Sequence, residues 1–112
     1  MIVEKRRLGE DVLLVVEGDI RQGESASFFA GALERSLEEG RGRVLIDLSR
    51  IRQMDSSGLA ELVSFLGRFE EQRRELLLVN PSDTSRELLR TSRLDARFST
   101  HDSVEAALAV EA

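Results

Sequence analysis

Three short runs of consecutive apolar residues dominate this 112-residue sequence. They lie at residues 12–18, 44–48 and 76–79, and each is typical of a buried strand. Between them, apolar residues recur every three or four positions, a spacing that predicts helices over 25–39 and from about 59 to 72. Strands that are connected through a helix pair in parallel, with a right-handed crossover. The sequence therefore predicts an α/β fold.

The remaining elements carry weaker patterns. A strand is expected at residues 2–8, and residues 9–11 form a short hairpin connection from it to the first apolar run. That first run is apolar on both faces, which predicts a central strand. After Pro81 the sequence predicts a short capped helix, a faint strand and a last helix. These three elements are expected at residues 82–92, 97–99 and 102–110.

Charge and residue usage exclude several classes of function. The formal net charge is −5, and the 16 basic residues are scattered among 21 acidic ones, with only two adjacent arginine pairs, at 6–7 and 73–74. This pattern gives no phosphate-binding stripe, so we expect no direct contact with nucleic acid. The chain has no cysteine, which excludes disulfides and thiolate metal sites and fits a reducing compartment.

Length and composition indicate one folded domain. Apolar residues make up 41% of the chain and charged residues 33%, far from the signature of disorder. The first residues carry charges where a signal peptide needs an apolar segment, and no stretch approaches the roughly 18 apolar residues of a membrane span. A bacterial cytoplasmic protein without membrane insertion is the default expectation.

Catalytic interpretations find few suitable residues. The single histidine, His101, has no second histidine or cysteine with which to hold a metal. A serine hydrolase built on Ser56 or Ser57 is an alternative because a triad is defined by geometry, although neither serine fits the G-x-S-x-G pattern. No glycine-rich phosphate loop occurs, and the sole lysine, Lys5, is wrongly placed for a phospho-accepting receiver domain. We therefore expect no catalysis, no metal and no bound cofactor.

The stretch MDSSGL, residues 54–59, leads from the second apolar run into the second helix. Its structural interpretation is a helix cap, in which a polar side chain accepts hydrogen bonds from free backbone N–H groups. Two adjacent hydroxyls exceed what one cap needs, so we expect at least one to point outward. The carboxyl ends of strands in open α/β sheets are also where ligand and partner sites lie. An outward serine here would be accessible to a modifying enzyme.

Residues 44–69, VLIDLSRIRQMDSSGLAELVSFLGRF, resemble the core of the STAS domain family, the anti-anti-sigma factors that regulate bacterial sigma factors by partner switching. The similarity continues in VEGDI at 16–20, LLLVNPSDTSRELL at 76–89 and DSVEAAL at 102–108. The resemblance implies a single STAS domain over residues 1–112. The fold that it implies is α/β, a mixed four- to five-stranded sheet with its helices packed mainly on one face.

The same resemblance implies an anti-sigma factor antagonist with no catalysis of its own. In the family, the first serine of the D-S-S-G-L signature is phosphorylated by an anti-sigma factor that is also a serine kinase, and a PP2C-type phosphatase removes the phosphate. The corresponding acceptor here is Ser56. The unmodified form would bind the anti-sigma factor and free the sigma factor, and phosphorylation would switch this binding off.

The implied partner surface combines residues 18–25 with residues 52–60. Met54 has two interpretations, an exposed apolar contact for the partner or packing in the core. Leu59 is expected in the core, where it anchors the helix. The partner-binding residues expected from the resemblance are Asp19, Arg21, Met54, Asp55, Ser56, Ser57 and Gly58, of which Ser57 and Gly58 also shape the helix entry.

Two positions depart from the family pattern. Arg21 stands where members of the phospho-switch type commonly carry an acid, as in G-E-L-D, with Asp19 as the neighbouring acid that could substitute. Arg93 stands where a glycine often precedes the leucine of the LDARF stretch. If the backbone at Arg93 is left-handed, a residue other than glycine costs about 1–2 kcal/mol there; otherwise the turn is built differently.

Two other functions remain as alternatives to the phospho-switch. The first keeps the fold and makes the chain a subunit of a stress-signalling scaffold or of a lipid-transport complex. In that role the same helix end docks a partner with or without phosphate. The second, more remote alternative is the small serine hydrolase built on Ser56.

Overall fold

The computed structural model describes residues 1–109, which form five strands and four helices. Their order along the chain follows the predicted alternation of strands and helices. The elements are β1 (Ile2–Leu8), β2 (Asp11–Ile20), α1 (Glu24–Glu39), β3 (Val44–Met54), α2 (Ser56–Glu71), β4 (Leu76–Val79), α3 (Asp83–Thr91), β5 (Ser99–His101) and α4 (Val104–Ala109).

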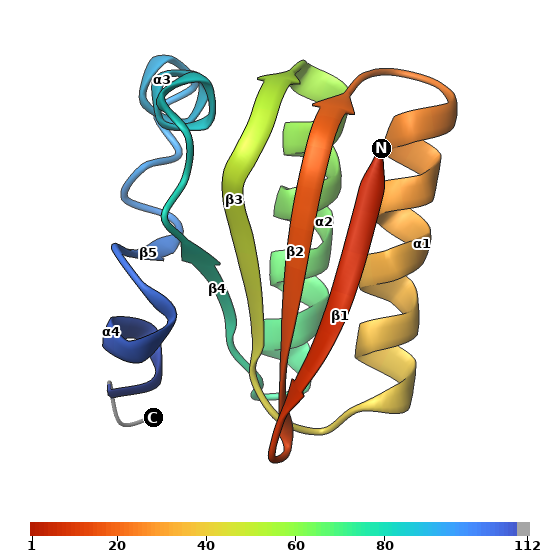
Figure 1. Cartoon of the computed structure of the whole chain (residues 1–112), viewed down its shortest axis with the longest axis vertical. Coiled ribbons are helices and arrows are strands. Elements are labelled where there is room, and N and C mark those ends of the chain that lie inside the picture. Colours follow the sequence, from red (N-terminus) through yellow and green to blue (C-terminus); the bar gives the residue numbers. More distant parts are fainter. Residues whose placement is uncertain (110–112) are drawn as a thin grey trace.

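The five strands form one mixed sheet in the order β1-β2-β3-β4-β5 (Figure 1). Strands β1 and β2 are an antiparallel hairpin, whereas β2, β3, β4 and β5 pair in parallel with their neighbours. Each parallel connection passes through a helix or a loop that contains one, because parallel strands need a long crossover. Strand β2 lies inside the sheet, as its two apolar faces predicted. The mixed sheet and the parallel pairing are therefore confirmed.

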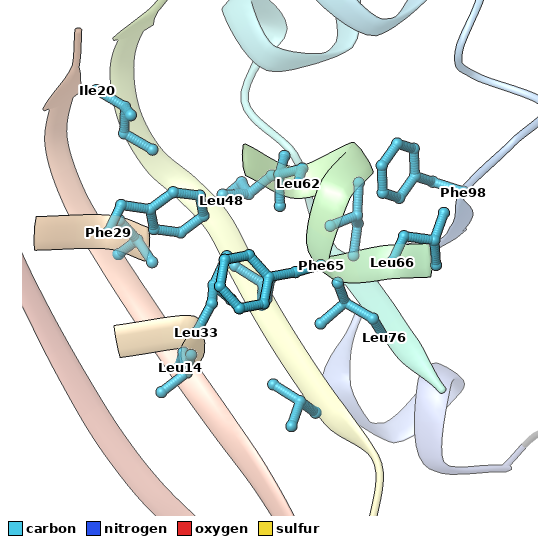
Figure 2. Close-up of a cluster of buried hydrophobic side chains, with 14 of the residues drawn as sticks. Leu14, Ile20, Phe29, Leu33, Leu48, Leu62, Phe65, Leu66, Leu76 and Phe98 are labelled. Atoms are coloured by element: carbon cyan, nitrogen blue, oxygen red, sulfur yellow. The ribbon is translucent and has the colours of Figure 1, made fainter. Parts of the chain in front are cut away.

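The main core lies between the sheet and three helices. Helices α1, α2 and α3 cover one face, and α4 packs against the other around a smaller cluster that contains Ala107 and Leu77. This arrangement confirms helices mainly on one face. Figure 2 shows how side chains from α1 and α2 meet those of the strands and of Phe98. The labelled members of this cluster are Leu14, Ile20, Phe29, Leu33, Leu48, Leu62, Phe65, Leu66, Leu76 and Phe98.

Strand β3 is longer than the sequence predicted. The apolar run ends at Leu48, but the strand continues to Met54 because its second half pairs with the end of β2. The register shifts twice in this region, between Val15 and Glu17 and between Gly18 and Asp19 of β2. The expected end of the strand at residue 48 is therefore wrong. Polar residues that look like a loop extend here because a neighbouring strand satisfies their backbone groups.

Smaller differences occur toward the end of the chain and in α2. Strand β5 occupies Ser99–His101, two residues later than predicted, because its pairing with Leu77–Val79 fixes the register. Helix α4 begins at Val104, and the expected end of this helix at residue 110 lies outside the described residues. On α2, the helical spacing of Leu59, Leu62, Val63, Leu66 and Phe69 predicts one buried face, but Val63 is 37% exposed and Phe65 is buried instead.

Candidate functional site

The ends of β2 and β3 bring the predicted surface together. Ile20 and Met54 are paired across these two strands, and the backbone N–H of Asp55 donates to the carbonyl of Ile20 at 3.0 Å. Helix α1 begins after β2 and helix α2 begins after β3, so both helix starts lie at the same edge of the sheet (Figure 1). Residues 18–25 and 52–60 are therefore neighbours in space, although they are distant in the sequence. The hydrogen bond between Gln22 and Asp55, for example, joins residues that are 33 positions apart.

The cap of α2 is Asp55. Its Oδ1 accepts hydrogen bonds from the backbone N–H groups of Ser57 at 2.9 Å and Gly58 at 3.3 Å. Its Oδ2 accepts from the backbone N–H of Gln22 at 2.8 Å, which ties the start of α2 to the loop before α1. The bond from Gln22 comes first among the interactions that hold the pKa of Asp55 below its ordinary value, and the positive charge of Arg21 acts in the same direction. One carboxylate thus caps the helix and joins two loops.

Neither serine of MDSSGL supplies the cap, which leaves their hydroxyls with different surroundings. Ser56 is the first residue of α2 and is exposed, while Ser57 is half-buried. The exposure of Ser56 agrees with the expectation that at least one of the two serines is accessible. Its phosphorylation stays a prediction. The Asp55 side chain accepts from the backbone N–H groups of Ser57 and Gly58, so the cap does not depend on the hydroxyl of Ser56.

Two residues of the predicted partner surface belong to the packing beneath it. Met54 is only 8% exposed and joins the main core, so its interpretation as an exposed apolar contact is wrong and the packing interpretation is correct. Gly58 is also buried, and a Cβ at this position would lie 2.7 Å from Cγ2 of Ile20 and 2.8 Å from Cγ of Met54. The glycine is needed because α2 approaches the strand ends so closely.

Arg21 and Asp19 form a charged group beside this cap. Nη2 of Arg21 donates a hydrogen bond to the side-chain oxygen of Gln53 and lies 3.5 Å from Oδ2 of Asp19. Nε of Arg52 lies 3.5 Å from the other carboxylate oxygen of Asp19. The acid considered as a substitute for the family's acid is therefore placed between two arginines. Sequence reasoning included Arg52 and Gln53 in the surface range but did not single them out.

A shallow groove runs between the starts of α1 and α2 and widens the site. Its walls include small side chains, which leave the space open, and Glu61 of the first helical turns of α2. The predicted surface, residues 18–25 and 52–60, contains half of this lining and omits the rest, since small residues on a helix carry no functional signal. The lining residues are Gln22, Gly23, Ala26, Ser27, Ala30, Ser57, Ala60 and Glu61.

Other kinds of site receive no support from the geometry. Within residues 1–109, no group of three or more histidine, cysteine or acidic side chains is arranged to hold a metal ion. His101 lies on β5, and among the described residues no hydrogen bond joins it to Ser56, the contact that a serine hydrolase would need. No helix in the described part of the chain has the length and apolar character required to cross a bilayer.

Comparisons with known proteins agree with this architecture. The model of the STAS domain matches residues 3–107. An anti-sigma factor antagonist from Mycobacterium paratuberculosis has a similar structure, with a TM-score of 0.84 and 18% identity over 96% of this chain and 90% of that one. The Bacillus cell fate determinant SpoIIAA in its phosphorylated form has a TM-score of 0.73 and 19% identity, with 96% of each chain covered.

Two further comparisons complete this result. A STAS domain protein from Planctomyces limnophilus matches with a TM-score of 0.75 and 20% identity over 95% of this chain and 94% of that one. A search of curated proteins found no match. The structural similarities establish a shared fold, and the family match covers nearly all of the chain. The protein therefore belongs to the STAS domain family.

Proposed function

We propose that this STAS domain is an anti-sigma factor antagonist that is regulated at Ser56. In this proposal the unmodified protein binds an anti-sigma factor through the surface around the start of α2 and thereby frees a sigma factor. The anti-sigma factor is also the serine kinase. It transfers the γ-phosphoryl group of ATP to Oγ of Ser56, which forms the O–P bond and releases ADP and the hydroxyl proton. A PP2C-type phosphatase hydrolyses the ester and restores binding.

The observation that carries the proposal is the division of roles between Asp55 and Ser56. Asp55 makes the hydrogen bonds that the start of α2 requires, while Ser56 is exposed beside it. Phosphorylation of Ser56 therefore removes no hydrogen bond of the cap. Backbone N–H groups and the positive end of the dipole at a helix start also favour a negative group, so the modified protein should stay folded.

The same phosphate would act strongly on a docked partner. It adds a charge of about −1.5 to −2 at neutral pH. In an interface this dianion loses its water or meets like charge, which is unfavourable. A loss of about 3 kcal/mol in binding free energy would weaken the complex roughly a hundredfold. Modification would thus switch the partner without unfolding the domain.

The comparisons support this role through the proteins that share the fold. SpoIIAA, described as an anti-sigma factor antagonist, has been solved in an unphosphorylated and in a phosphorylated form, and both resemble this chain. A phosphorylated form is therefore known for a protein with a similar backbone. Transfer of that regulation to Ser56 is our proposal, and it requires a direct test on this protein.

Phosphorylation can be tested with labelled ATP and a purified serine kinase whose gene lies near the gene of this protein. We expect one phosphate on the wild-type chain, located at Ser56 by mass spectrometry, and none on the Ser56→Ala variant. The Ser57→Ala variant is the matched control because it removes the adjacent hydroxyl, and it should be phosphorylated normally. Labelling at Ser57, or equal labelling of Ser56→Ala, would contradict the proposal.

Binding provides the second half of the test. Isothermal titration of the same kinase should give a Kd at least about a hundredfold weaker for the phosphorylated chain than for the unmodified one. Ser56→Ala should bind as the unmodified protein does. Equal affinity of both forms would reject the switch and favour the alternative of a scaffold or transport subunit that docks its partner independently of phosphate.

A further inference from the structure

Arg21 precedes Gln22, the residue whose backbone N–H is hydrogen-bonded to the cap of α2. The backbone N–H of Gln22, the next residue, donates to Oδ2 of Asp55 at 2.8 Å, and Ser56 follows Asp55 directly. The backbone N–H of Asp55 also donates to the carbonyl of Ile20 at 3.0 Å, so Arg21 and Ser56 each directly follow a residue of this backbone bond. The Arg21 guanidinium is also near enough to Asp55 to lower the pKa of that carboxyl. A long cationic side chain therefore begins on the backbone that is bonded to the residue before the proposed acceptor.

The present partners of Arg21 hold it weakly. Its side chain is 57% exposed, it donates to the neutral amide of Gln53, and its ion pair with Asp19 spans 3.5 Å. Exposed ion pairs of this length contribute little to stability. Moving the guanidinium away from these groups would therefore cost little. A nearby phosphate dianion offers a stronger attraction, because it carries about twice the charge and accepts two parallel N–H bonds from arginine.

We propose that Arg21 is the intramolecular partner of a phosphate on Ser56. After modification, the guanidinium turns away from Gln53 and Asp19 and pairs with the phosphate oxygens. The proposal rests on the proposed function in one respect, since it takes Ser56 as the modified residue. It extends that function by naming the residue of this chain that binds the phosphate.

This contact would change two features of the docking surface in one event. Phosphorylation adds a dianion at Ser56, and it also occupies the Arg21 cation, which before modification is exposed and held only by Gln53 and Asp19. Arg52 is less suited to the role, because it pairs with Oδ1 of Asp19 and does not adjoin the hydrogen bond between Gln22 and Asp55, as Arg21 does. Arg21 therefore distinguishes this surface from one that carries an acid at residue 21.

The experiment uses the full chain with phosphoserine incorporated at residue 56 by an expanded genetic code, so that no kinase is required. Phosphorus NMR then measures the second pKa of the phosphate, whose ordinary value is about 6. The acids around the two helix starts, namely Asp55, Asp19, Glu24 and Glu61, would raise this pKa, whereas the cations Arg21 and Arg52 would lower it. The measurement is therefore a comparison between variants. We expect Arg21→Gln to raise the phosphate pKa by about 0.5 pH unit.

Matched variants distinguish a specific contact between Arg21 and the phosphate from the general electrostatic effect of nearby charges. Arg52→Gln removes the same charge from the same cluster and should change the phosphate pKa by less than half as much. Arg21→Lys keeps the charge without the paired donors, and it should fall between wild type and Arg21→Gln. Circular dichroism and amide spectra confirm the fold of each variant. An unchanged pKa in Arg21→Gln, or an equal shift in Arg52→Gln, would overturn the proposal.

These outcomes are independent of the kinase experiment. If no kinase modifies Ser56 while the encoded phosphoserine pairs with Arg21, the proposed function fails and the contact stands. If the kinase modifies Ser56 and the phosphate pKa is unchanged in Arg21→Gln, the proposed function stands and this inference fails.

Discussion

At the scale of single residues, the four residues Asp55 to Gly58 have different roles at the start of α2. Asp55 caps α2 and accepts the N–H of Gln22, while Gly58 allows the helix to approach the strand ends. Ser57 donates its backbone N–H to the cap. Ser56 is the exposed residue among them, which is why a modification there is compatible with the fold.

We expect Gly58→Ala to destabilise the protein. The added Cβ would lie within 2.8 Å of side-chain atoms of Ile20 and Met54, and relieving this overlap should cost about 1–3 kcal/mol in the free energy of unfolding. Urea denaturation followed by circular dichroism measures the change. Gly67→Ala is the control on the same helix, because a Cβ there meets nothing within 4 Å. It should instead stabilise the protein by about 0.5–1 kcal/mol. A stable Gly58→Ala variant would contradict the packing argument.

At the scale of elements, α2 and α3 end with the same turn, built around an arginine in the left-handed region. Arg73 has a φ of 57° and Arg93 a φ of 60°. After α3, the N–H of Leu94 donates to the carbonyl of Leu89 at 2.8 Å, the long bond of a Schellman motif, and an equivalent bond follows α2. The sequence analysis left the conformation of Arg93 open, and the left-handed alternative is the correct one. Both turns are strained, since glycine is the residue that favours this conformation.

Replacing Arg93 by glycine should therefore stabilise α3. Relief of the left-handed strain is worth about 1–2 kcal/mol, and the extra freedom of glycine in the unfolded chain removes part of it, which leaves a gain of about 0.5–1 kcal/mol. The midpoint of thermal unfolding should rise accordingly. Arg93→Ala removes the same side chain but retains a Cβ, so it should give no gain. Equal effects of glycine and alanine would show that strain is not the cause.

At the scale of the whole molecule, Arg74 joins segments that are distant in sequence. Its guanidinium donates to the carbonyl of Gly42 at 3.0 Å, of Leu37 at 2.8 Å and of Ser36 at 3.3 Å, and it lies over the ring of Phe69 at 4.7 Å. The end of α1, the loop before β3 and the end of α2 are thus held by one side chain. Partial burial of the guanidinium lowers the pKa of Arg74.

Arg74→Ala should lower the free energy of unfolding by about 2 kcal/mol, because several carbonyl groups lose a charged donor at once. Denaturant unfolding monitored by circular dichroism gives the value. The adjacent Arg73 has an exposed side chain, so Arg73→Ala should change stability by no more than about 0.5 kcal/mol. Similar losses in both variants would indicate that the effect comes from the turn and not from the contacts of Arg74.

The sequence by itself determined the order of elements, the placement of β2 inside the sheet and the location of the exposed serine. Those features follow from local patterns, because runs of apolar residues and helical spacing record burial directly. The position of Ser56 followed from the strand and helix on either side of it. Even so, local chemistry could not choose among Asp55, Ser56 and Ser57 as the helix cap.

Tertiary structure decided the features that depend on partners far away in the chain. The second half of β3 is a strand because β2 lies beside it, and Met54 is buried because α2 packs over it. Asp55 is the cap that also binds the backbone of Gln22, and the fold alone joins the loop after β2 to the start of α2. Backbone groups are the same in every segment, so the sequence does not indicate which distant segments will form hydrogen bonds with each other. Only the folded chain reveals which residues these bonds join.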